Sequence, residues 1–243
     1  MVNKMNKIEL LQNIINNSQN IVFFSGAGIS TLSGLKDFRS ADGLYNQHFD
    51  YPPEEILSHH FFIENPKYFF DFYRQKLNPL SYKPNIIHYY LKKLEDTGKL
   101  KTIITQNIDN FHLLAGNKNV IELHGNVMQN YCTKCHKFYN GNYVFNSLGI
   151  PKCTCGGIIK PNVVLYEENL DDQIINDAIK KISQCDTLII AGTSLTVYPA
   201  AGLVKLFHGK NLVIINHDLT KYDQVANLVI NEDLEEVFSK LSI

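Results

Sequence analysis

The chain has 243 residues, enough for one domain with a sizeable core or for a large domain that carries a small insert. Apolar residues make up 44% of it and charged residues 19%, which excludes a disordered chain, and a net charge of −1 excludes a strong attraction to nucleic acid or to a membrane surface. Five cysteines are too few for a disulfide scaffold.

The N-terminal segment predicts an amphipathic helix. Ile8, Leu11, Ile14 and Ile15 recur at helical spacing among Asn and Lys residues, without the apolar core of a signal peptide. The longest aliphatic runs further along are of strand length, far shorter than a membrane span. We therefore expect a soluble, cytoplasmic, monomeric protein with neither nucleic-acid nor membrane partners.

Short apolar runs alternate with amphipathic stretches along most of the chain. The runs predict buried strands at Ile21–Phe24, Thr102–Thr105, Val120–Leu123, Thr187–Ala191, Leu212–Ile215 and Leu228–Ile230. The stretches predict helices at Ile86–Leu94, Gln173–Ile182, Ala200–Phe207 and Asp233–Leu241. This order predicts an α/β fold, a doubly wound, Rossmann-like parallel sheet, in which ligands bind outside the carboxyl ends of the strands.

Two stretches interrupt the alternation and predict a small second domain. Residues 41–80 are rich in aromatic rings and helical in pattern, and residues 131–161 hold two pairs of cysteines. We expect the first to form the helical part and the second the zinc-ribbon part of the small domain. Residues 1–40, 81–130 and 162–243 are left to form the Rossmann-like domain.

The segment after the first strand is rich in glycine and hydroxyl side chains: Gly26, Ala27, Gly28, Ser30 and Thr31. Glycine permits a sharp turn and a close approach to a phosphate, and the N-terminus of a following helix offers N–H donors. Gly34 is misplaced for a dehydrogenase fingerprint, and no acidic residue ends a clear second strand. The pattern favours a phosphate-binding turn of another type, and a plain strand-to-helix turn stays open as the alternative.

Phe38 and Arg39 follow within a few residues of this turn. Arg39 is one of only two arginines, and a guanidinium can hold a pyrophosphate or a carboxylate with two hydrogen bonds. The ring of Phe38 can cover a flat ligand. A loop salt bridge beside a core phenylalanine is the alternative. The other arginine, Arg74, lies in the aromatic stretch, and we expect it at the surface.

Polar side chains also gather at the ends of later strands. They are Gln106, Asn107, Ile108 and Asp109 after one strand, Gly192, Thr193 and Ser194 after another, and Asn216 and Asp218 after a third. Amides suit ribose hydroxyls or a carboxamide, and small hydroxyls suit a phosphate. Helix capping by Asn107 or Asp109 is the alternative.

His124 comes at the end of the strand Val120–Leu123. A histidine with an ordinary pKa of about 6.5 can accept a proton at neutral pH. The sequence contains neither a Ser–His–Asp arrangement nor a pair of catalytic carboxylates. We therefore expect His124 to be the general base, if the protein uses one; a structural histidine is the alternative.

Four cysteines form two tight pairs: Cys132 with Cys135, and Cys153 with Cys155. Four thiolates in two pairs favour a tetrahedral Zn²⁺ site, although the second pair is one residue tighter than usual. Because all four positions are filled by protein, we expect a structural zinc ion.

Together these motifs resemble those of the sirtuins, NAD-dependent protein lysine deacylases of a bacterial type. The resemblance rests on Gly26–Gly34, Asp37–Arg39, Thr105–Asp109, Leu123–Gly125, the four cysteines and Gly192–Leu195, in family order over nearly the whole chain.

The resemblance implies that NAD is consumed and that the products are free lysine, nicotinamide and O-acyl-ADP-ribose. It places the pyrophosphate over Gly26–Gly28, near Thr193 and Ser194, and the reacting ribose under Phe38 and Arg39. It assigns the ribose side to Gln106 and Asn107, and the nicotinamide carboxamide to Ile108 and Asp109. The adenosine is expected at Asn216, Asp218 and Asp233. His124 becomes the base on a ribose hydroxyl. A protein mono-ADP-ribosyltransferase with the same NAD site and a zinc-ribbon binding module are the alternatives.

The resemblance also implies a peptide site between the zinc part and the main domain. Val163, Val164, Leu165 and Tyr166 would pair with an acyl-lysine peptide as a strand. The sequence departs from the family at Lys36 and at Glu167, which replaces a frequent glycine. Phe70 and Tyr73 stand where succinyl-preferring members have Tyr and Arg, so a succinyl carboxylate would be buried without a cation. We therefore expect removal of acetyl and longer neutral acyl chains, with weak desuccinylation.

Overall fold

A parallel sheet forms the larger part of the computed structural model, which describes residues 6–38, 40 and 43–243. Among these residues, six strands pair in parallel, and most of their side chains are buried, as expected of a sheet covered on both faces. The strands are β1 (Ile21–Ser25), β2 (Leu100–Thr105), β3 (Val120–Glu122), β7 (Thr187–Ala191), β8 (Asn211–Ile215) and β9 (Leu228–Ile230).

The strand order is β3-β2-β1-β7-β8-β9, so the chain moves outward from β1 in one direction and from β7 in the other. The register aligns the ends of the central strands, since Ser25 lies beside Thr105 of β2 and beside Ala191 of β7. A parallel sheet has its ligand crevice where the direction of winding reverses. The sheet therefore opens a crevice at the carboxyl ends of β1 and β7.

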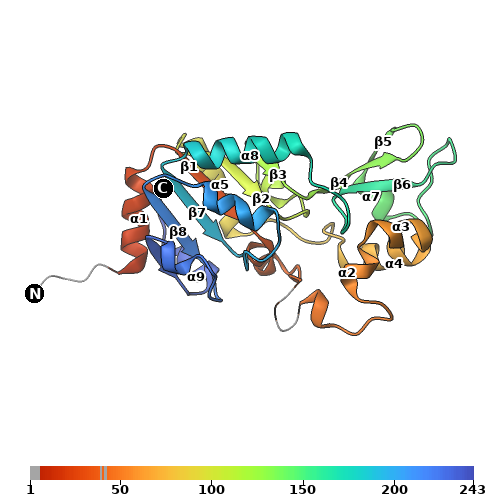
Figure 1. Cartoon of the computed structure of the whole chain (residues 1–243), viewed down its shortest axis with the longest axis horizontal. Helices are drawn as coiled ribbons and strands as arrows, with labels where there is room; N and C mark the ends of the chain where they lie inside the picture. The colour runs from red at the N-terminus through yellow and green to blue at the C-terminus, as the bar shows by residue number, and fades with distance from the viewer. Residues whose placement is uncertain (1–5, 39, 41–42) are drawn as a thin grey trace, which may run out of the picture.

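Helices cover both faces of this sheet (Figure 1). On one face, α1 (Lys7–Asn17), α5 (Ile86–Asp96) and α9 (Leu234–Ser239) pack against alternate strand residues such as Phe23 and Ile189. On the other, α8 (Asp172–Gln184) and the 3₁₀ segment η4 (Ala200–Leu206) pack against Phe24 and Ile190. None of the helices in the described part of the chain combines the length and the apolar character that a membrane span needs.

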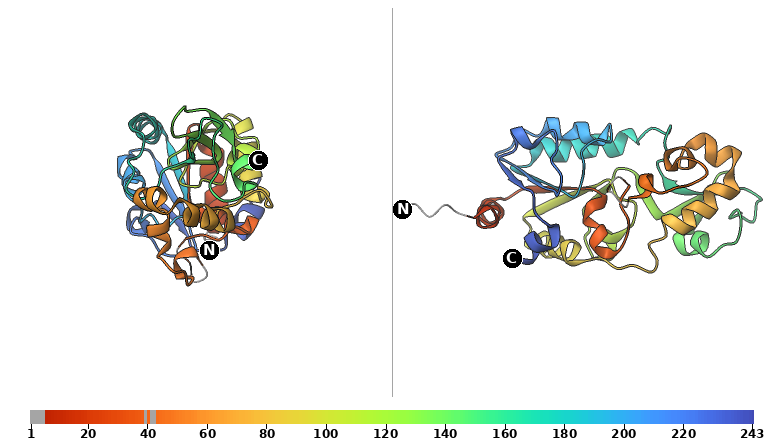
Figure 2. Two further views of the ribbon diagram at one scale, coloured as in Figure 1. Left: turned by 90° about the vertical axis from the view of Figure 1, so that its right-hand side faces the viewer. Right: turned by 90° about the horizontal axis from the view of Figure 1, so that it is seen from below.

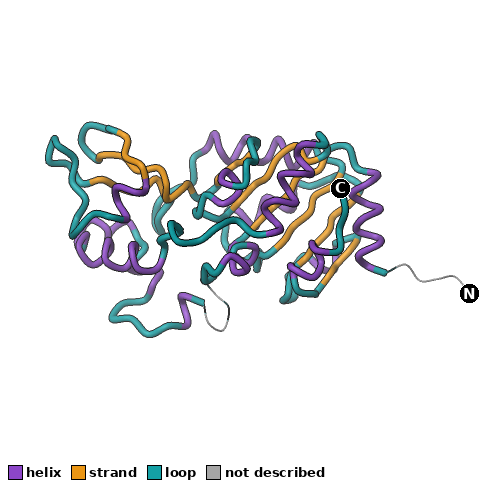
Figure 3. Tube along the Cα trace, turned by 180° about the vertical axis from the view of Figure 1, so that it is seen from behind, coloured by secondary structure: helices purple, strands orange, loops and turns teal. Residues whose placement is uncertain are grey.

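A smaller module lies at the other end of the long axis from α1 and the C-terminus (Figures 1 and 2). Its helices are α2 (Pro53–Ile56), α3 (His59–Glu64), α4 (Pro66–Lys76) and α7 (Gly141–Phe145). Its antiparallel sheet has the order β5-β4-β6, with β4 (Gly125–Cys132), β5 (Phe138–Asn140) and β6 (Ile159–Val163), so β6 is an edge strand. Aromatic side chains of α3 and α4 pack with residues of β4 and β6 in one core. The helices and strands of this module are seen from behind in Figure 3, at the end of the molecule away from the N-terminus.

The predicted strands and the doubly wound fold are confirmed, and three details differ. The segment after β1 forms two 3₁₀ turns, η1 (Ala27–Ile29) and η2 (Thr31–Ser33), instead of an α-helix. Residues 200–206 are also 3₁₀ instead of α-helical. The antiparallel sheet was not anticipated, and its strands β4 and β6 cross the predicted segment boundaries at 131 and 162, so the domain division stays a prediction.

The remaining short elements are η3 (Leu44–Asn46), α6 (Phe111–Leu114) and η5 (Asp223–Val225).

Candidate active site

A cavity of about 1130 Å³ lies where the sheet's carboxyl edge meets the smaller module. Its lining includes every predicted catalytic, NAD-binding and peptide-binding residue that the structure describes: Gly26, Ala27, Gly28, Ser30, Thr31, Phe38, Gln106, Asn107, Ile108, Asp109, His124, Val163, Val164, Leu165, Tyr166, Gly192, Thr193, Ser194, Asn216, Asp218 and Asp233. Arg39 lies outside the described residues. Motifs spread over two hundred residues thus face one space, because parallel strands bring their ends to one edge.

The glycines after β1 and β7 interlock. A Cβ atom on Gly28 would lie 2.8 Å from Gly192 Cα, and one on Gly192 would lie 2.5 Å from the backbone nitrogen of Ile29. The N–H groups of Gly26 and Gly28 donate to the carbonyl oxygens of Ala191 and Gly192, at 3.2 and 2.8 Å. These two N–H groups are therefore not available to a phosphate, and the glycines act instead by letting the two loops, and a ligand, approach closely.

Below this turn, Asp109 is held in a buried polar network. The Ser30 hydroxyl donates to Asp109 Oδ2 at 2.6 Å, and the Phe111 N–H donates to Oδ1 at 2.9 Å. Burial raises the pKa of Asp109, while these two hydrogen bonds lower it. Asn107 Nδ2 donates to Ser30 Oγ at 3.1 Å, but Asn107 Oδ1 is buried and has no hydrogen-bond partner within the described chain. An unpaired buried acceptor that borders a cavity suits a ligand N–H or O–H group.

His124 is oriented by the neighbouring loop. Its Nδ1 lies 2.9 Å from the carbonyl oxygen of Gln106, which can only accept, so Nδ1 carries the hydrogen and Nε2 is left with a lone pair. Burial lowers the pKa of His124, and the hydrogen bond to Gln106 partly opposes that shift. The imidazole is therefore neutral and able to accept a proton at neutral pH.

Asn126 ties the turn of His124 to the loop of Asp109, and sequence reasoning missed it. Its Nδ2 donates to Glu122 Oε1 and to Asn110 Oδ1, both at 2.7 Å, and Asn110 has a left-handed backbone with φ of 72°. Burial raises the pKa of Glu122 to about 7, opposed by the hydrogen bond from Asn126 and assisted by the charge of Asp109. No spacing rule reveals such a bridge, because Asn110 comes from the loop after β2, whereas Glu122 and Asn126 flank the turn of His124.

Other predicted residues have structural partners of their own. Asp233 caps α9, since its Oδ1 accepts from the N–H groups of Glu235 and Glu236 at 2.8 and 3.1 Å. Asp218 is largely exposed, and its Oδ1 lies 3.1 Å from His217 Nδ1. Thr193 Oγ1 accepts from Gln106 Nε2 at 2.9 Å.

The predicted peptide segment, residues 163–166, borders the cavity, and its two ends have different hydrogen-bond partners. Val163 belongs to β6 and pairs with Gly125 of β4, whereas Tyr166 bonds to the smaller module through Leu57 and His59. The hydroxyl of Tyr166 also contacts that of Tyr45. Glu167 has a left-handed backbone with φ of 75°, and its carboxylate lies 2.7 Å from His60 Nδ1. The departure from glycine at this position thus comes with a specific partner.

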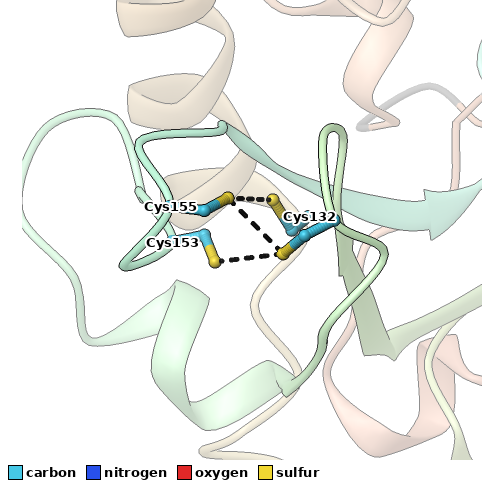
Figure 4. Close-up of side chains that lie close together, drawn as sticks. Cys132, Cys153 and Cys155 are labelled. Carbon is cyan, nitrogen blue, oxygen red and sulfur yellow. Dashed lines mark hydrogen bonds between the residues drawn. The ribbon is translucent and has the colours of Figure 1, made fainter.

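The four cysteines of the zinc motif lie together, and Figure 4 labels Cys132, Cys153 and Cys155 among them. Their sulfur atoms all lie within 4.8 Å of one another, and the Cys132–Cys155 and Cys135–Cys153 pairs are 3.4 and 3.6 Å apart. A tetrahedral site with Zn–S distances of about 2.3 Å needs sulfur atoms roughly 3.8 Å apart. The donor set therefore fits one zinc ion, fully ligated by protein.

Three comparisons place these features among known proteins. A family model described as the Sir2 family matches residues 26–199. Relatives named NAD-dependent protein deacetylase include one from Clostridium perfringens, 56% identical over 97% of this chain and 98% of its own length, and one from Cutibacterium acnes, 48% identical over 95% and 96%.

Solved structures agree with these relatives. A Sir2 structure with a deacetylated p53 peptide and 3'-O-acetyl ADP ribose superposes with a TM-score of 0.89 at 37% identity, over 96% of both chains. A Sir2 structure with a p53 peptide and NAD⁺ superposes with a TM-score of 0.85 at 39% identity, over 97% of both chains.

Proposed function

This chain belongs to the Sir2 family, and from that premise we propose that it is an NAD-dependent protein lysine deacetylase. The observation that carries the proposal is the single cavity shared by the phosphate-binding turn, His124 and the edge strand β6. Such a space can hold a dinucleotide beside an acyl-lysine side chain. The products are the free lysine, nicotinamide and O-acyl-ADP-ribose.

The residues around the cavity fit NAD. The interlocked glycines leave no room for a Cβ atom, so the backbone of Gly26–Gly28 can lie against the pyrophosphate, with Thr193 and Ser194 on its other side. Asn107 Oδ1, buried without a partner among the described residues, can accept from a ribose hydroxyl. Ile108 and Asp109 then hold the carboxamide, Phe38 and Arg39 cover the reacting ribose, and Asn216, Asp218 and Asp233 meet the adenosine.

When bound, NAD supplies the ribose carbon at which the reaction takes place: nicotinamide leaves this carbon, and the acyl oxygen bonds to it. His124 accepts a proton from a ribose hydroxyl at Nε2, while its Nδ1–H stays bonded to Gln106. Ser30 and Phe111 hold the Asp109 carboxyl in place. The apolar side chains of Val163 and Leu165 exclude water from the acyl group.

The acyl-lysine peptide contacts Val163, at the end of the edge strand β6, and the residues that follow it, Val164, Leu165 and Tyr166. Because β6 is an edge strand, its outer side offers main-chain hydrogen bonds, which accept many sequences. The four cysteines hold a structural zinc ion that fixes the loops flanking β4 and β6. We include in the proposal a monomeric, cytoplasmic protein without nucleic-acid partners, consistent with its net charge of −1.

NAD labelled in its adenosine half distinguishes this function from protein mono-ADP-ribosylation. We expect the label on a small acetylated product when acetyl-lysine peptide is present, and we expect His124→Ala to abolish that product. Label that stays on protein, with the peptide still acetylated, would instead establish the transferase.

A further inference from the structure

Ser25, the last residue of β1, holds both ends of the loop of residues 106–110, which joins β2 to α6. At the start of the loop, the carbonyl oxygen of Ser25 accepts from the Gln106 N–H at 3.0 Å. Just beyond its end, the hydroxyl of Ser25 lies 3.1 Å from Nε2 of His112, the second residue of α6. Because both contacts are made to one residue of the central sheet, the two ends of the loop cannot move apart while both remain.

The proposed NAD site depends on this loop. Its side chains Asn107 and Asp109 line the cavity, and the carbonyl oxygen of Gln106 accepts from Nδ1 of His124 at 2.9 Å. The residues of the loop, all of them described, form neither a helix nor a strand, so contacts with other segments set its shape. A shift of its backbone would therefore displace the NAD contacts and the ring of His124 together.

The contact between Ser25 and His112 lies behind the loop, in the core. Ser25 is 0% and His112 3% exposed, and neither residue lines the cavity. Nδ1 of His112 is buried without a partner among the described residues, so Ser25 provides the only hydrogen bond that they offer this ring. Burial lowers the pKa of His112 well below its ordinary value, assisted by His88, whose ring centroid is 5.0 Å away. The bond therefore joins two neutral groups and does not change with pH near neutrality.

We propose that His112 is a positioning residue: through Ser25 it fixes the loop of residues 106–110 in the shape that binds NAD. The same loop orients His124, so the contact also serves the general base. This inference rests on the proposed deacylase function. It separates the two substrates, because the loop contacts NAD, whereas the proposed peptide contacts, residues 163–166, belong to another segment. Loosening the loop should raise KM for NAD and lower kcat, and should leave KM for the peptide nearly unchanged.

Steady-state kinetics of the full-length, zinc-loaded protein tests this role, with NAD and an acetyl-lysine peptide varied in turn. His112→Leu removes the hydrogen bond from one side, and Ser25→Ala removes it from the other with a smaller change in volume. In each variant we expect KM for NAD to rise and kcat to fall by at least about fivefold, because each leaves a buried polar partner unpaired. Combining the two should add little, since both remove the same contact. His112→Gln, whose amide can bond to the Ser25 hydroxyl, should recover most of the loss.

Ser18→Ala is the matched control. Ser18 is also buried, and its hydroxyl lies 2.7 Å from Oγ1 of Thr187, the first residue of β7, at the opposite edge of the sheet from the cavity. This variant removes a buried hydrogen bond of the same kind and should keep the wild-type KM for NAD. Partial unfolding lowers the apparent kcat but leaves KM unchanged, so a purely structural role for His112 predicts no change in KM.

An unchanged KM for NAD in both His112→Leu and Ser25→Ala would overturn the inference. So would an equal rise of that KM in Ser18→Ala, or a His112→Gln variant that is no better than His112→Leu. If the wild-type protein deacylates no peptide, the proposed function itself fails. In that case the NAD dissociation constants of the same variants, measured by calorimetry, decide the positioning role, with a rise in His112→Leu and Ser25→Ala alone supporting it and equal values overturning it.

Discussion

Replacing Gly192 with alanine tests whether the two glycine loops really interlock. Gly192 has a left-handed backbone with φ of 62°, and a Cβ atom there would lie 2.5 Å from the Ile29 nitrogen and 2.8 Å from the Gly28 carbonyl carbon. Gly98 is the matched control, since its φ is 76° and nothing lies within 4 Å of its Cβ position. Both substitutions impose the same backbone strain, but only one also imposes overlap.

The expected magnitudes follow from these two terms. Left-handed backbone costs an alanine about 1–2 kcal/mol of unfolding free energy, and overpacking against backbone adds about 1–3 kcal/mol. Alanine also has less conformational entropy than glycine in the unfolded chain, which restores about 0.4–1 kcal/mol of the unfolding free energy equally in both variants. Gly192→Ala should therefore lose about 1–3 kcal/mol more than Gly98→Ala.

Urea unfolding followed by circular dichroism measures this difference, since the chain has no tryptophan to report by fluorescence. Calorimetry with NAD gives a second readout: separating the loops in Gly192→Ala should weaken binding at least about tenfold, whereas Gly98→Ala should bind normally. Equal losses of stability in the two variants, with equal NAD affinity, would refute the interlocking of the loops.

Three further outcomes are expected. Cys153→Ser or a strong chelator should release one zinc ion per chain and unfold the smaller module, because zinc contributes on the order of 10 kcal/mol to the folding free energy of such sites. A near-UV circular dichroism spectrum that is unchanged after metal loss would count against this. The folded-state pKa of Glu122 is about 7, above its ordinary 4.5, so the free energy of unfolding should fall by about 3 kcal/mol as pH rises between these values. Glu122→Gln should remove that fall in pH-dependent urea titrations. His124→Ala should lower kcat/KM by about 10²- to 10⁴-fold. In the wild-type protein, the acid limb of the plot of kcat/KM against pH should lie below pH 6.5, because burial lowers the pKa of His124. An acid limb at or above pH 6.5 would contradict a buried His124.

The sheet and its ligand edge could be predicted because their signals are local. Runs such as Thr187–Ala191 are apolar without alternation, and the polar residues that follow each run, including Asp109 and Thr193, must meet at one edge of a parallel sheet. The spacing of the cysteine pairs likewise predicts a shared metal site, and their sulfur atoms do lie together.

The features that sequence reasoning missed depend on contacts between distant segments. β4 pairs with β6 through an irregular register between Asn126 and Asn130, which breaks the alternation that announces a strand. In α4 the rings of Phe69, Phe70 and Tyr73 are equally apolar in pattern, so nothing local separates core packing from a cavity wall. The bridge through Asn126 needs the fold before it can be seen.

The central proposal is that one cavity holds NAD and acetyl-lysine together, so that NAD is split only when the peptide is present. Its most direct test quantifies nicotinamide, deacetylated peptide and O-acetyl-ADP-ribose in the same reaction by mass spectrometry, with and without the acetyl-lysine peptide. We predict the three products in a one-to-one-to-one ratio with the peptide and almost no nicotinamide without it. Nicotinamide released at the same rate in both reactions, or a peptide that stays acetylated while NAD is consumed, would contradict the proposal.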